Sequence, residues 1–168
     1  FALQNDKDML SGELKNGLKY YIKENKLPQN TAIFYLVVSS GSTDERDGEQ
    51  GLAHFLEHMA FNGSRDFSKN ELIKQLESLG VKFGADLNAQ TSYDQTSYTL
   101  SINVNEKNLK DVFKVFSNWI DGVKIDAGEL DKERGVIMEE ERQRNTPAYR
   151  LYLAQSKDIF AGSIYQKR

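Results

Sequence analysis

The chain has 168 residues, a length that suits one domain with one hydrophobic core and leaves little room for a second complete domain. Apolar residues at 39% and charged residues at 28% are ordinary values for a folded globular protein, so a disordered or fibrous chain is excluded. The net charge of -3 leaves no basic stripe for phosphate groups, which argues against binding to nucleic acid.

The absence of cysteine restricts the chemistry that the chain can carry. Without cysteine there is no disulfide, no thiolate zinc site and no cysteine nucleophile, so any metal must be bound by imidazole and carboxylate groups. No apolar stretch approaches the roughly 20 residues that a helix needs to cross a bilayer. The chain begins at Phe1 rather than at a methionine, which is compatible with removal of a leader, a tag or part of a longer precursor.

Three strands are predicted near the amino terminus. Residues 10–14 and 19–23 flank Asn16-Gly17, a dipeptide typical of hairpin turns, and therefore predict a β-hairpin. Residues 31–39, TAIFYLVVS, form a nearly continuous apolar and β-branched run. Such a run favours a strand in the middle of a sheet, with both faces covered.

Two helices are predicted in the next part of the chain. Residues 41–51 read as a glycine-punctuated loop that leads into LAHFLEHMAF (52–61), a stretch without proline or glycine that predicts a helix buried in the core. Ser68 and Glu71 form a capping-box pattern that begins a second helix, and Gly80 ends it.

The remaining residues predict two strands and then three helices. We expect the strands at 82–91 and 97–104, and the helices at 106–120, 127–144 and 148–160. Runs of strands separated by paired helices, without strict alternation, are typical of an α+β fold. We therefore expect helices packed on one face of a largely antiparallel sheet.

The two histidines of the chain lie four residues apart in the predicted helix 52–61. Each residue of a helix turns by about 100°, so His54, Glu57 and His58 project within one narrow wedge. Burying these groups costs on the order of several kcal/mol unless a partner compensates, and a divalent cation would do so. The alternative is a pair of core histidines bonded to backbone carbonyls, with Glu57 in an ordinary ion pair. Finding both histidines with the glutamate on one face favours the metal site.

The order His-x-x-Glu-His is the inverse of the commoner zincin motif and is typical of the inverzincins. Such a zinc site needs a third protein ligand, which must be Asp or Glu when neither cysteine nor a further histidine is present. Residues 133–141, ERGVIMEEE, offer such groups on a predicted helix, where Glu133 and Glu140 share a face that leans toward Ile137. Without the histidines, this acidic run would be more typical of a solvated helix surface.

Three segments in this order resemble the pitrilysin family, which includes insulin-degrading enzyme and the mitochondrial processing peptidases. They are HFLEHMAFNGS, GADLNAQTSYDQTSYTLSI and ERGVIMEEE. The resemblance runs from about Ser11 to the end of the chain. The first and third motifs are highly specific together, whereas the Asn-Ala-x-Thr part of the second is weak alone. It implies a zinc-dependent endopeptidase.

The resemblance assigns a role to each residue of the predicted site. It implies Zn²⁺ bound by His54, His58 and Glu140, with Glu57 as the general base that takes a proton from a zinc-activated water. It also implies that Glu133 supports catalysis without binding the metal itself.

The resemblance further implies how a peptide or an unfolded polypeptide would bind. Asn88 and Ala89 would lie on an edge strand that adds the extended substrate to the sheet through backbone hydrogen bonds. An equally open alternative is that Asn88 only satisfies a turn and that Ala89 packs tightly.

Members of the family are built from paired repeats, and this chain ends where the first repeat would still continue. The resemblance therefore implies that residues 1–168 are the N-terminal catalytic domain of a longer peptidase, truncated before the domain is complete. A C-terminal half or a partner subunit would complete the site, and the fragment alone would be weakly active or inactive. The resemblance is also compatible with export to the periplasm. A non-catalytic binding or assembly subunit is the alternative, but such proteins typically lose part of the metal motif.

Overall fold

The computed structural model describes residues 6–167, so the start of the chain at Phe1 lies outside the described part. The chain divides into two compact units, residues 1–31 and residues 32–168. The first unit contains an antiparallel hairpin of β1 (Met9–Glu13) and β2 (Lys19–Lys23). Its turn contains Gly17 with φ +86°, a left-handed conformation that suits glycine. This confirms the hairpin predicted at Asn16-Gly17.

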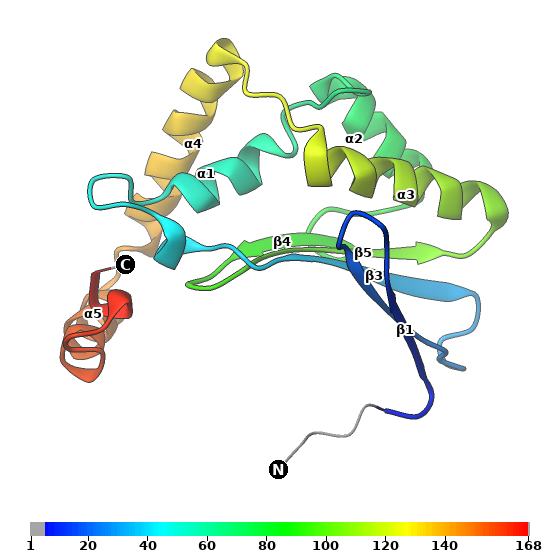
Figure 1. Cartoon of the computed structure of the whole chain (residues 1–168). Helices are drawn as coiled ribbons and strands as arrows, with labels where there is room; N and C mark the ends of the chain where they lie inside the picture. Colours follow the sequence, from blue (N-terminus) through cyan, green and yellow to red (C-terminus); the bar gives the residue numbers. More distant parts are fainter. Residues whose placement is uncertain (1–5, 168) are drawn as a thin grey trace. The chain divides into compact units, whose positions relative to one another are not determined.

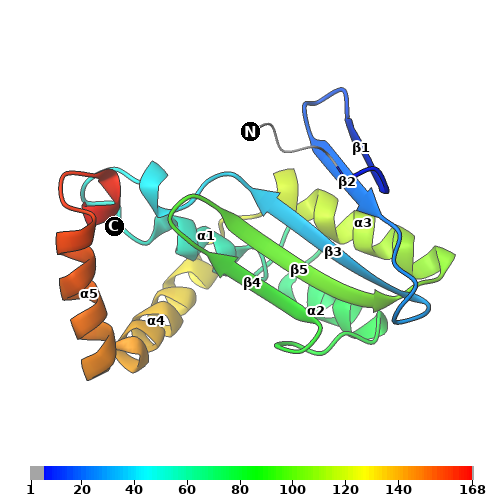
Figure 2. The same cartoon turned by 90° about the horizontal axis from the view of Figure 1, so that it is seen from below.

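The second unit is built on a three-stranded sheet in the order β3, β5, β4. Its strands are β3 (Thr31–Val38), β4 (Leu87–Thr91) and β5 (Thr96–Asn103). Strands β4 and β5 are antiparallel, with Leu87 opposite Leu100 and Thr91 opposite Thr96. Strand β3 runs opposite to β5 on its other side (Figure 2). Strand β4 is therefore one edge of the sheet.

The prediction that residues 31–39 form a central strand is wrong, because β5 occupies the middle of the sheet. Side chains of β3 alternate between the two faces, as in any strand. Leu36 belongs to the core and Phe34 packs against it, whereas Tyr35 and Val37 are 66% and 52% exposed. The apolar run thus covers the core with one face only, and hydrophobicity alone did not distinguish this edge position from a central one.

The strand predicted over residues 82–91 begins only at Leu87. Residues 82–86 form a turn instead, in which Asp86 donates its N–H to the carbonyl of Lys82 at 2.8 Å. In return, the Asp86 carboxylate accepts the N–H of Lys82 at 3.0 Å. Gly84 has φ +84° within this turn. The local hydrogen bonds of the aspartate compete here with strand pairing.

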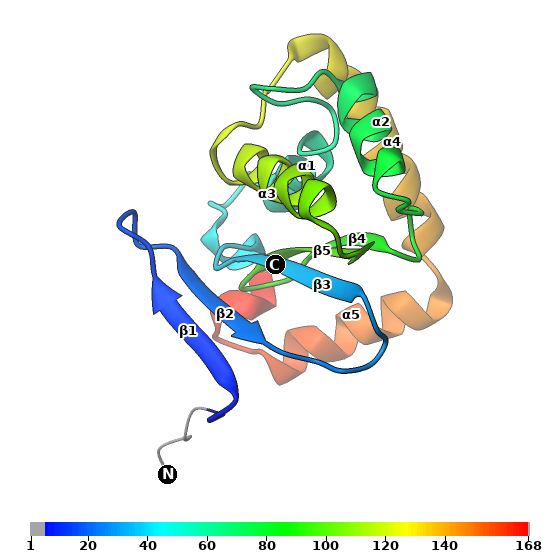
Figure 3. The same cartoon turned by 90° about the vertical axis from the view of Figure 1, so that its right-hand side faces the viewer.

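Three helices cover one face of the sheet (Figures 1 and 3). They are α1 (Leu52–Met59), α2 (Lys69–Ser78) and α3 (Glu106–Asp121). The core between helices and sheet includes Leu72 and Leu76 from α2, Val112, Val115 and Trp119 from α3, and Leu100 and Ile102 from β5. This arrangement confirms the predicted α+β fold with helices on one face of an antiparallel sheet.

Helix α2 begins at the predicted capping box. The N–H of Ser68 donates to Glu71 Oε2 at 2.8 Å, and the N–H of Glu71 donates to Ser68 Oγ at 3.4 Å. The helix ends before Gly80, which has φ +77°. Both ends of this helix are therefore as the sequence predicted.

Two further helices follow, α4 (Ala127–Arg144) and α5 (Pro147–Ile159), and short 3-10 turns lie at η1 (Ser42–Asp44) and η2 (Ile164–Lys167). Asp126 caps α4 by accepting the N–H of Glu129 at 3.0 Å. Helix α4 lies against α1 (Figure 1). Within residues 6–167, no helix is both long and apolar enough to cross a membrane.

Helix α1 is half-buried rather than enclosed in the core as predicted. Glu57 and Met59 are buried, whereas Leu52 and Leu56 are 55% and 51% exposed. The helix contacts β4 and β5 on one side and α4 on another. It also contacts the short turn η1 that precedes it in the chain.

Candidate metal centre

The amino end of α1 is held by a carboxylate from the preceding loop. Glu45 accepts the N–H of Gly51 through Oε2 at 3.0 Å and the N–H of Ala53 through Oε1 at 2.9 Å. The first N–H groups of a helix have no partner within the helix, and a negative charge there also suits the helix dipole. Glu45 is therefore part of what positions the helix that carries both histidines.

The loop that contains Glu45 is anchored to the turn between β4 and β5. The N–H of Thr43 donates to the carbonyl of Tyr93 at 2.8 Å, and its hydroxyl donates to the same oxygen at 2.7 Å. Gly41 approaches this turn so closely that a Cβ would lie 2.6 Å from the Tyr93 oxygen. Helix α1 and the turn after strand β4 are thus joined through one network of side-chain and backbone hydrogen bonds.

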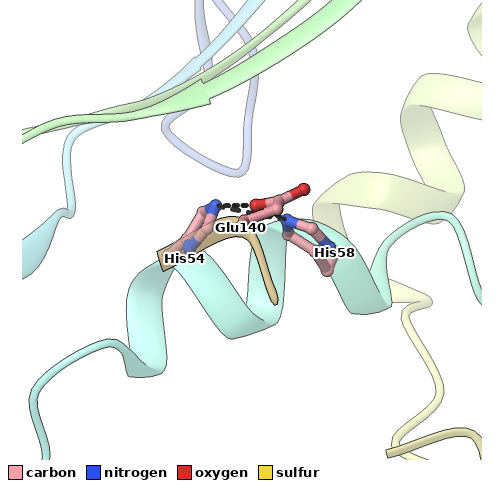
Figure 4. A group of neighbouring side chains, drawn as sticks. All are labelled: His54, His58 and Glu140. Atoms are coloured by element: carbon pink, nitrogen blue, oxygen red, sulfur yellow. Dashed lines mark hydrogen bonds and ion pairs between the residues drawn. The ribbon is translucent and has the colours of Figure 1, made fainter. Parts of the chain in front are cut away.

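Three side chains converge where α1 and α4 meet (Figure 4). The Nε2 atoms of His54 and His58 are 3.2 Å apart. Glu140 Oε2 lies 3.6 Å from the first and 3.5 Å from the second. The structure therefore brings together two residues of one helix and a carboxylate of another that is remote in sequence.

These three distances suit a tetrahedral zinc ion. Zinc binds imidazole nitrogen and carboxylate oxygen at about 2.0–2.1 Å, so neighbouring ligands of a tetrahedron lie about 3.3 Å apart. The triangle of His54, His58 and Glu140 has edges of 3.2, 3.5 and 3.6 Å. Its donor set of two imidazoles and one carboxylate is one that zinc uses in catalytic sites, with a fourth position open. The residues present therefore fit the ion.

The environment of His54 favours the neutral ring, which is the form that binds a metal. Burial lowers the pKa of His54 below its usual value, and the neighbouring His58 ring lowers it further. Glu57 and Glu140 oppose this shift. A neutral ring offers a nitrogen lone pair, whereas the protonated ring offers none.

The second ring nitrogen of His58, Nδ1, has a hydrogen-bond partner of its own. Its Nδ1 lies 2.7 Å from Oε1 of Glu133, one of the two glutamates predicted on α4. A carboxylate there accepts a hydrogen bond from the Nδ1–H group. The lone pair of the neutral ring is then on Nε2, which faces His54. Glu133 is thus placed to orient His58 rather than to contact an ion.

Asn62 takes part in this arrangement and was not predicted from the sequence. Its side-chain amide donates to Glu133 Oε2 at 2.8 Å and to the carbonyl of His58 at 3.2 Å. The residue is 8% exposed. It lies inside the HFLEHMAFNGS motif, but nothing in the pattern of that motif indicates that its side chain reaches α4.

Glu57 lies on the buried side of α1, at 7% exposure. The hydroxyl of Thr91, at the end of β4, donates to its Oε2 atom. Within the described residues, no group hydrogen-bonds to the other oxygen, Oε1. Thr91 was also missed, since a hydroxyl on a strand gives no sign of its partner. The carboxylate of Glu57 is thus fixed through one oxygen and accessible through the other.

The acidic run 133–141 divides between two environments. Glu133 and Glu140 lie against the histidines of α1, whereas Glu139 pairs with Arg142 at 2.8 Å. The hydrogen bond from Arg142 holds the pKa of Glu139 below its usual value. Glu139 and Glu140 have similar exposure, 45% and 42% of the side chain, whereas Glu133 is 12% exposed. Contact with the histidines, and not burial, therefore distinguishes Glu140 from Glu139.

A cleft of about 370 Å³ adjoins the histidine helix. It is lined by Glu57 and His58 from α1, by Asn88 and Ala89 from β4, and by apolar side chains that include Phe61 and Phe83. The amide of Asn88 donates to the carbonyl of Gly84 at 3.1 Å, which is the turn contact of the alternative interpretation. Ala89 packs against the core, and both residues also line the cleft.

The register of the sheet shows which backbone groups β4 leaves open. The N–H of Ser92 donates to the carbonyl of Gln95, and bonded and non-bonded residue pairs alternate along an antiparallel ladder. The pairs at Thr91 and Ala89 are therefore non-bonded, so their N–H and C=O groups point away from β5. They face the free edge of the sheet, beside the cleft.

Comparison with known proteins identifies the protein family to which the chain belongs. Residues 20–157 match the family described as Insulinase (Peptidase family M16), and the chain belongs to that family. This agrees with the resemblance that the three sequence motifs indicated.

Particular relatives are similar over nearly the whole chain. The "Probable zinc protease PqqL" of Haemophilus influenzae is 39% identical over 164 residues, which are 97% of this chain and 18% of the relative. The stromal processing peptidase of Arabidopsis thaliana is 35% identical over 147 residues, 83% of this chain and 11% of the relative. The crystal structure of the periplasmic protease PqqL from Escherichia coli superposes with a TM-score of 0.95 and 38% identity, covering 100% of this chain and 19% of that one. The chain thus spans about a fifth of the PqqL proteins that it matches.

Proposed function

We propose that this chain is a zinc-binding catalytic domain of an endopeptidase that hydrolyses peptide bonds. The observation that carries the proposal is the triangle of His54, His58 and Glu140, whose edges suit one tetrahedral zinc ion. The names of the relatives support it, because PqqL is called a zinc protease and the stromal enzyme a processing peptidase. Sequence features that would mark a non-catalytic assembly subunit, such as a broken metal motif, are not found.

Zinc bound there would acidify a water molecule and polarise the carbonyl of the peptide bond to be cleaved. Glu57 accepts the proton of the attacking water at Oε1, the oxygen without a partner in the described part of the chain, and returns it to the departing amine nitrogen. Thr91 holds the other oxygen of Glu57 in place during both transfers. Glu133 keeps the His58 ring in the orientation that faces the centre.

The substrate in this proposal is an extended peptide or an unfolded polypeptide. It pairs with the free edge of β4, where Ala89 and Thr91 offer backbone N–H and C=O groups next to Glu57. Backbone pairing makes little demand on sequence. Asn88 borders the same cleft and contributes its polar side chain at the rim.

The proposal extends to the longer protein. Since the chain spans 18% of the PqqL relative, we infer that a further half, in the same chain or in a partner subunit, completes the substrate site. The chain alone is then expected to bind zinc and to cleave slowly or not at all, because groups that orient the substrate and exclude water are missing. The Escherichia coli PqqL protease is described as periplasmic, which supports export of this protein.

Metal analysis of the purified chain tests the proposal. We expect about one zinc per chain, retained after dialysis, and loss of that zinc in His54→Ala and Glu140→Gln. Glu139→Gln is the matched control, because Glu139 lies next to Glu140 and has similar exposure but pairs with Arg142 instead of the histidines. Absence of zinc from the unaltered chain, after zinc has been supplied, would favour the non-catalytic assembly subunit instead.

A further inference from the structure

The buried side chain of Asn62 links the end of α1 to a carboxylate of α4. It follows the end of α1, and its amide nitrogen has two oxygen acceptors besides a long contact of 4.0 Å to the sulfur of Met59. One is the carbonyl of His58, one turn earlier at 3.2 Å, and the other is Glu133 Oε2 at 2.8 Å. A primary amide has two N–H groups, so both are used.

Glu133 depends on this amide. Its side chain is 12% exposed, and its two oxygens are divided between His58 Nδ1 at 2.7 Å and Asn62 at 2.8 Å. Among the residues that the structure describes, no lysine or arginine pairs with Glu133. The oxygens of a carboxylate buried to this degree need hydrogen-bond partners, and Asn62 supplies the one that His58 does not.

The hydrogen bonds among His58, Glu133 and Asn62 form a closed cycle. His58 binds Glu133 through its imidazole, Glu133 binds Asn62, and Asn62 returns to the backbone of His58. Two members come from the end of α1 and one from α4, 75 residues away from His58. Because this cycle is closed, the Glu133 carboxylate cannot rotate without breaking a hydrogen bond to His58 or Asn62.

We propose that Asn62 is a positioning residue of the metal centre: by holding Glu133 Oε2, it keeps Oε1 on His58 Nδ1 and so keeps the His58 lone pair on Nε2. The inference rests on the proposed function, since it assigns Asn62 a part in metal binding. Groups that hydrogen-bond directly to a metal ligand, as Glu133 does to His58, typically change metal affinity by about 10- to 100-fold when removed. Asn62 acts through Glu133, so this range is the upper limit for its effect.

The chain contains a matched control for this role. Asn118 is also buried, and its amide likewise donates to a backbone carbonyl one turn earlier, Lys114 at 2.9 Å, and to a carboxylate, Asp66 at 2.9 Å. It has the same local chemistry as Asn62 but no contact with the histidines. A purely structural asparagine should behave like Asn118.

The test compares Asn62→Ala with Asn118→Ala, each measured below its unfolding temperature by chelator competition for zinc. We expect the folded Asn62→Ala chain to bind zinc more weakly than the unaltered chain, by up to about 10- to 100-fold. Asn118→Ala should lose stability and keep its zinc affinity. Asn62→Leu, which restores apolar volume without a donor, replaces Asn62→Ala if that variant does not fold. Zinc affinity within twofold of the unaltered chain in the folded Asn62 variant would overturn the inference while leaving the proposed function intact.

A second readout needs no metal. The chain has only two histidines, so nitrogen NMR of the metal-free protein resolves both imidazoles. We expect the neutral His58 ring to carry its proton on Nδ1 in the unaltered chain and in Asn118→Ala, and to become a mixture of tautomers in Asn62→Ala. If the unaltered chain binds no zinc, the proposed function fails, and the position of the His58 proton alone then tests the role of Asn62. An unchanged His58 tautomer in Asn62→Ala would refute that role.

Discussion

His58 is the residue on which the most contacts of the site depend. Its Nδ1 is bonded to Glu133 at 2.7 Å, and its Nε2 faces His54 at 3.2 Å. The ring therefore links a supporting carboxylate to the proposed metal position, and its two nitrogens have different tasks. His54 differs, because burial and the neighbouring ring keep its pKa low without a carboxylate contact as short as that of His58.

Glu57 has the environment expected of a proton carrier. One oxygen is held by Thr91, and the side chain borders the cleft. For Glu57→Gln in the full-length protein, we expect unchanged zinc content and peptide hydrolysis reduced by about 10²- to 10⁴-fold, the usual contribution of a general base. Zinc analysis and the rate of cleavage of an unfolded peptide measure the two quantities.

The outcome separates Glu57 from the metal ligands. Glutamine has the same size and can still accept the hydrogen bond of Thr91, but it cannot take a proton from water. Glu139→Gln provides a control for loss of one negative charge near the centre. If Glu57→Gln cleaves at a near-native rate with a full complement of zinc, Glu57 is not the base.

At the scale of elements, the site is made by three pieces that are far apart in the sequence. Helix α1 supplies His54, Glu57 and His58, helix α4 supplies Glu133 and Glu140, and strand β4 supplies the free edge. Figure 1 shows α1 between α4 and the strands. The position of α1 thus determines both where the proposed metal ligands lie and their distance from the proposed peptide-binding edge.

The free edge of β4 leads to a prediction about substrates. Only alternate residues of an added strand exchange backbone hydrogen bonds with Ala89 and Thr91. In a series of peptides N-methylated at one position each, we expect weaker binding with a period of two residues around the cleaved bond. Competition binding to the full-length Glu57→Gln protein measures this. Equal losses at successive positions would show that the peptide does not bind by strand addition.

The ends of helices were predicted well because the residues that determine them are local. Ser68 and Glu71 satisfy each other at the start of α2, and α4 has the predicted bounds 127–144. Strands were predicted less well, because their limits depend on partners. Whether β3 is central or at an edge is decided by β5, and the turn at residues 82–86 is decided by hydrogen bonds of Asp86.

Within the candidate site, the sequence indicated the residues that lie on one face of a helix. His54, Glu57 and His58 project in one wedge, and Glu133 and Glu140 lie on one face, so spacing alone indicated both groups. The supporting residues were not found in this way. Asn62, Thr91 and Glu45 act through contacts with segments remote in sequence or through a loop conformation, and asparagine, threonine and glutamate at such positions usually face solvent or end a turn.

At the scale of the whole molecule, the chain is a family domain that carries one complete set of candidate ligands. It belongs to the insulinase family over residues 20–157 and superposes on part of a much longer protease. The described residues include the proposed metal ligands, the proposed base and one proposed edge of the substrate site. What remains for the rest of the protein, in our proposal, is to cover the substrate and to exclude water.

The most direct measurement is a crystal structure of the zinc-loaded chain, with anomalous diffraction recorded on both sides of the zinc absorption edge. We predict one strong anomalous peak about 2.0–2.1 Å from the Nε2 atoms of His54 and His58 and from a carboxylate oxygen of Glu140. A zinc peak bound by other residues, or Glu140 turned away from a zinc held by the histidines, would contradict the account.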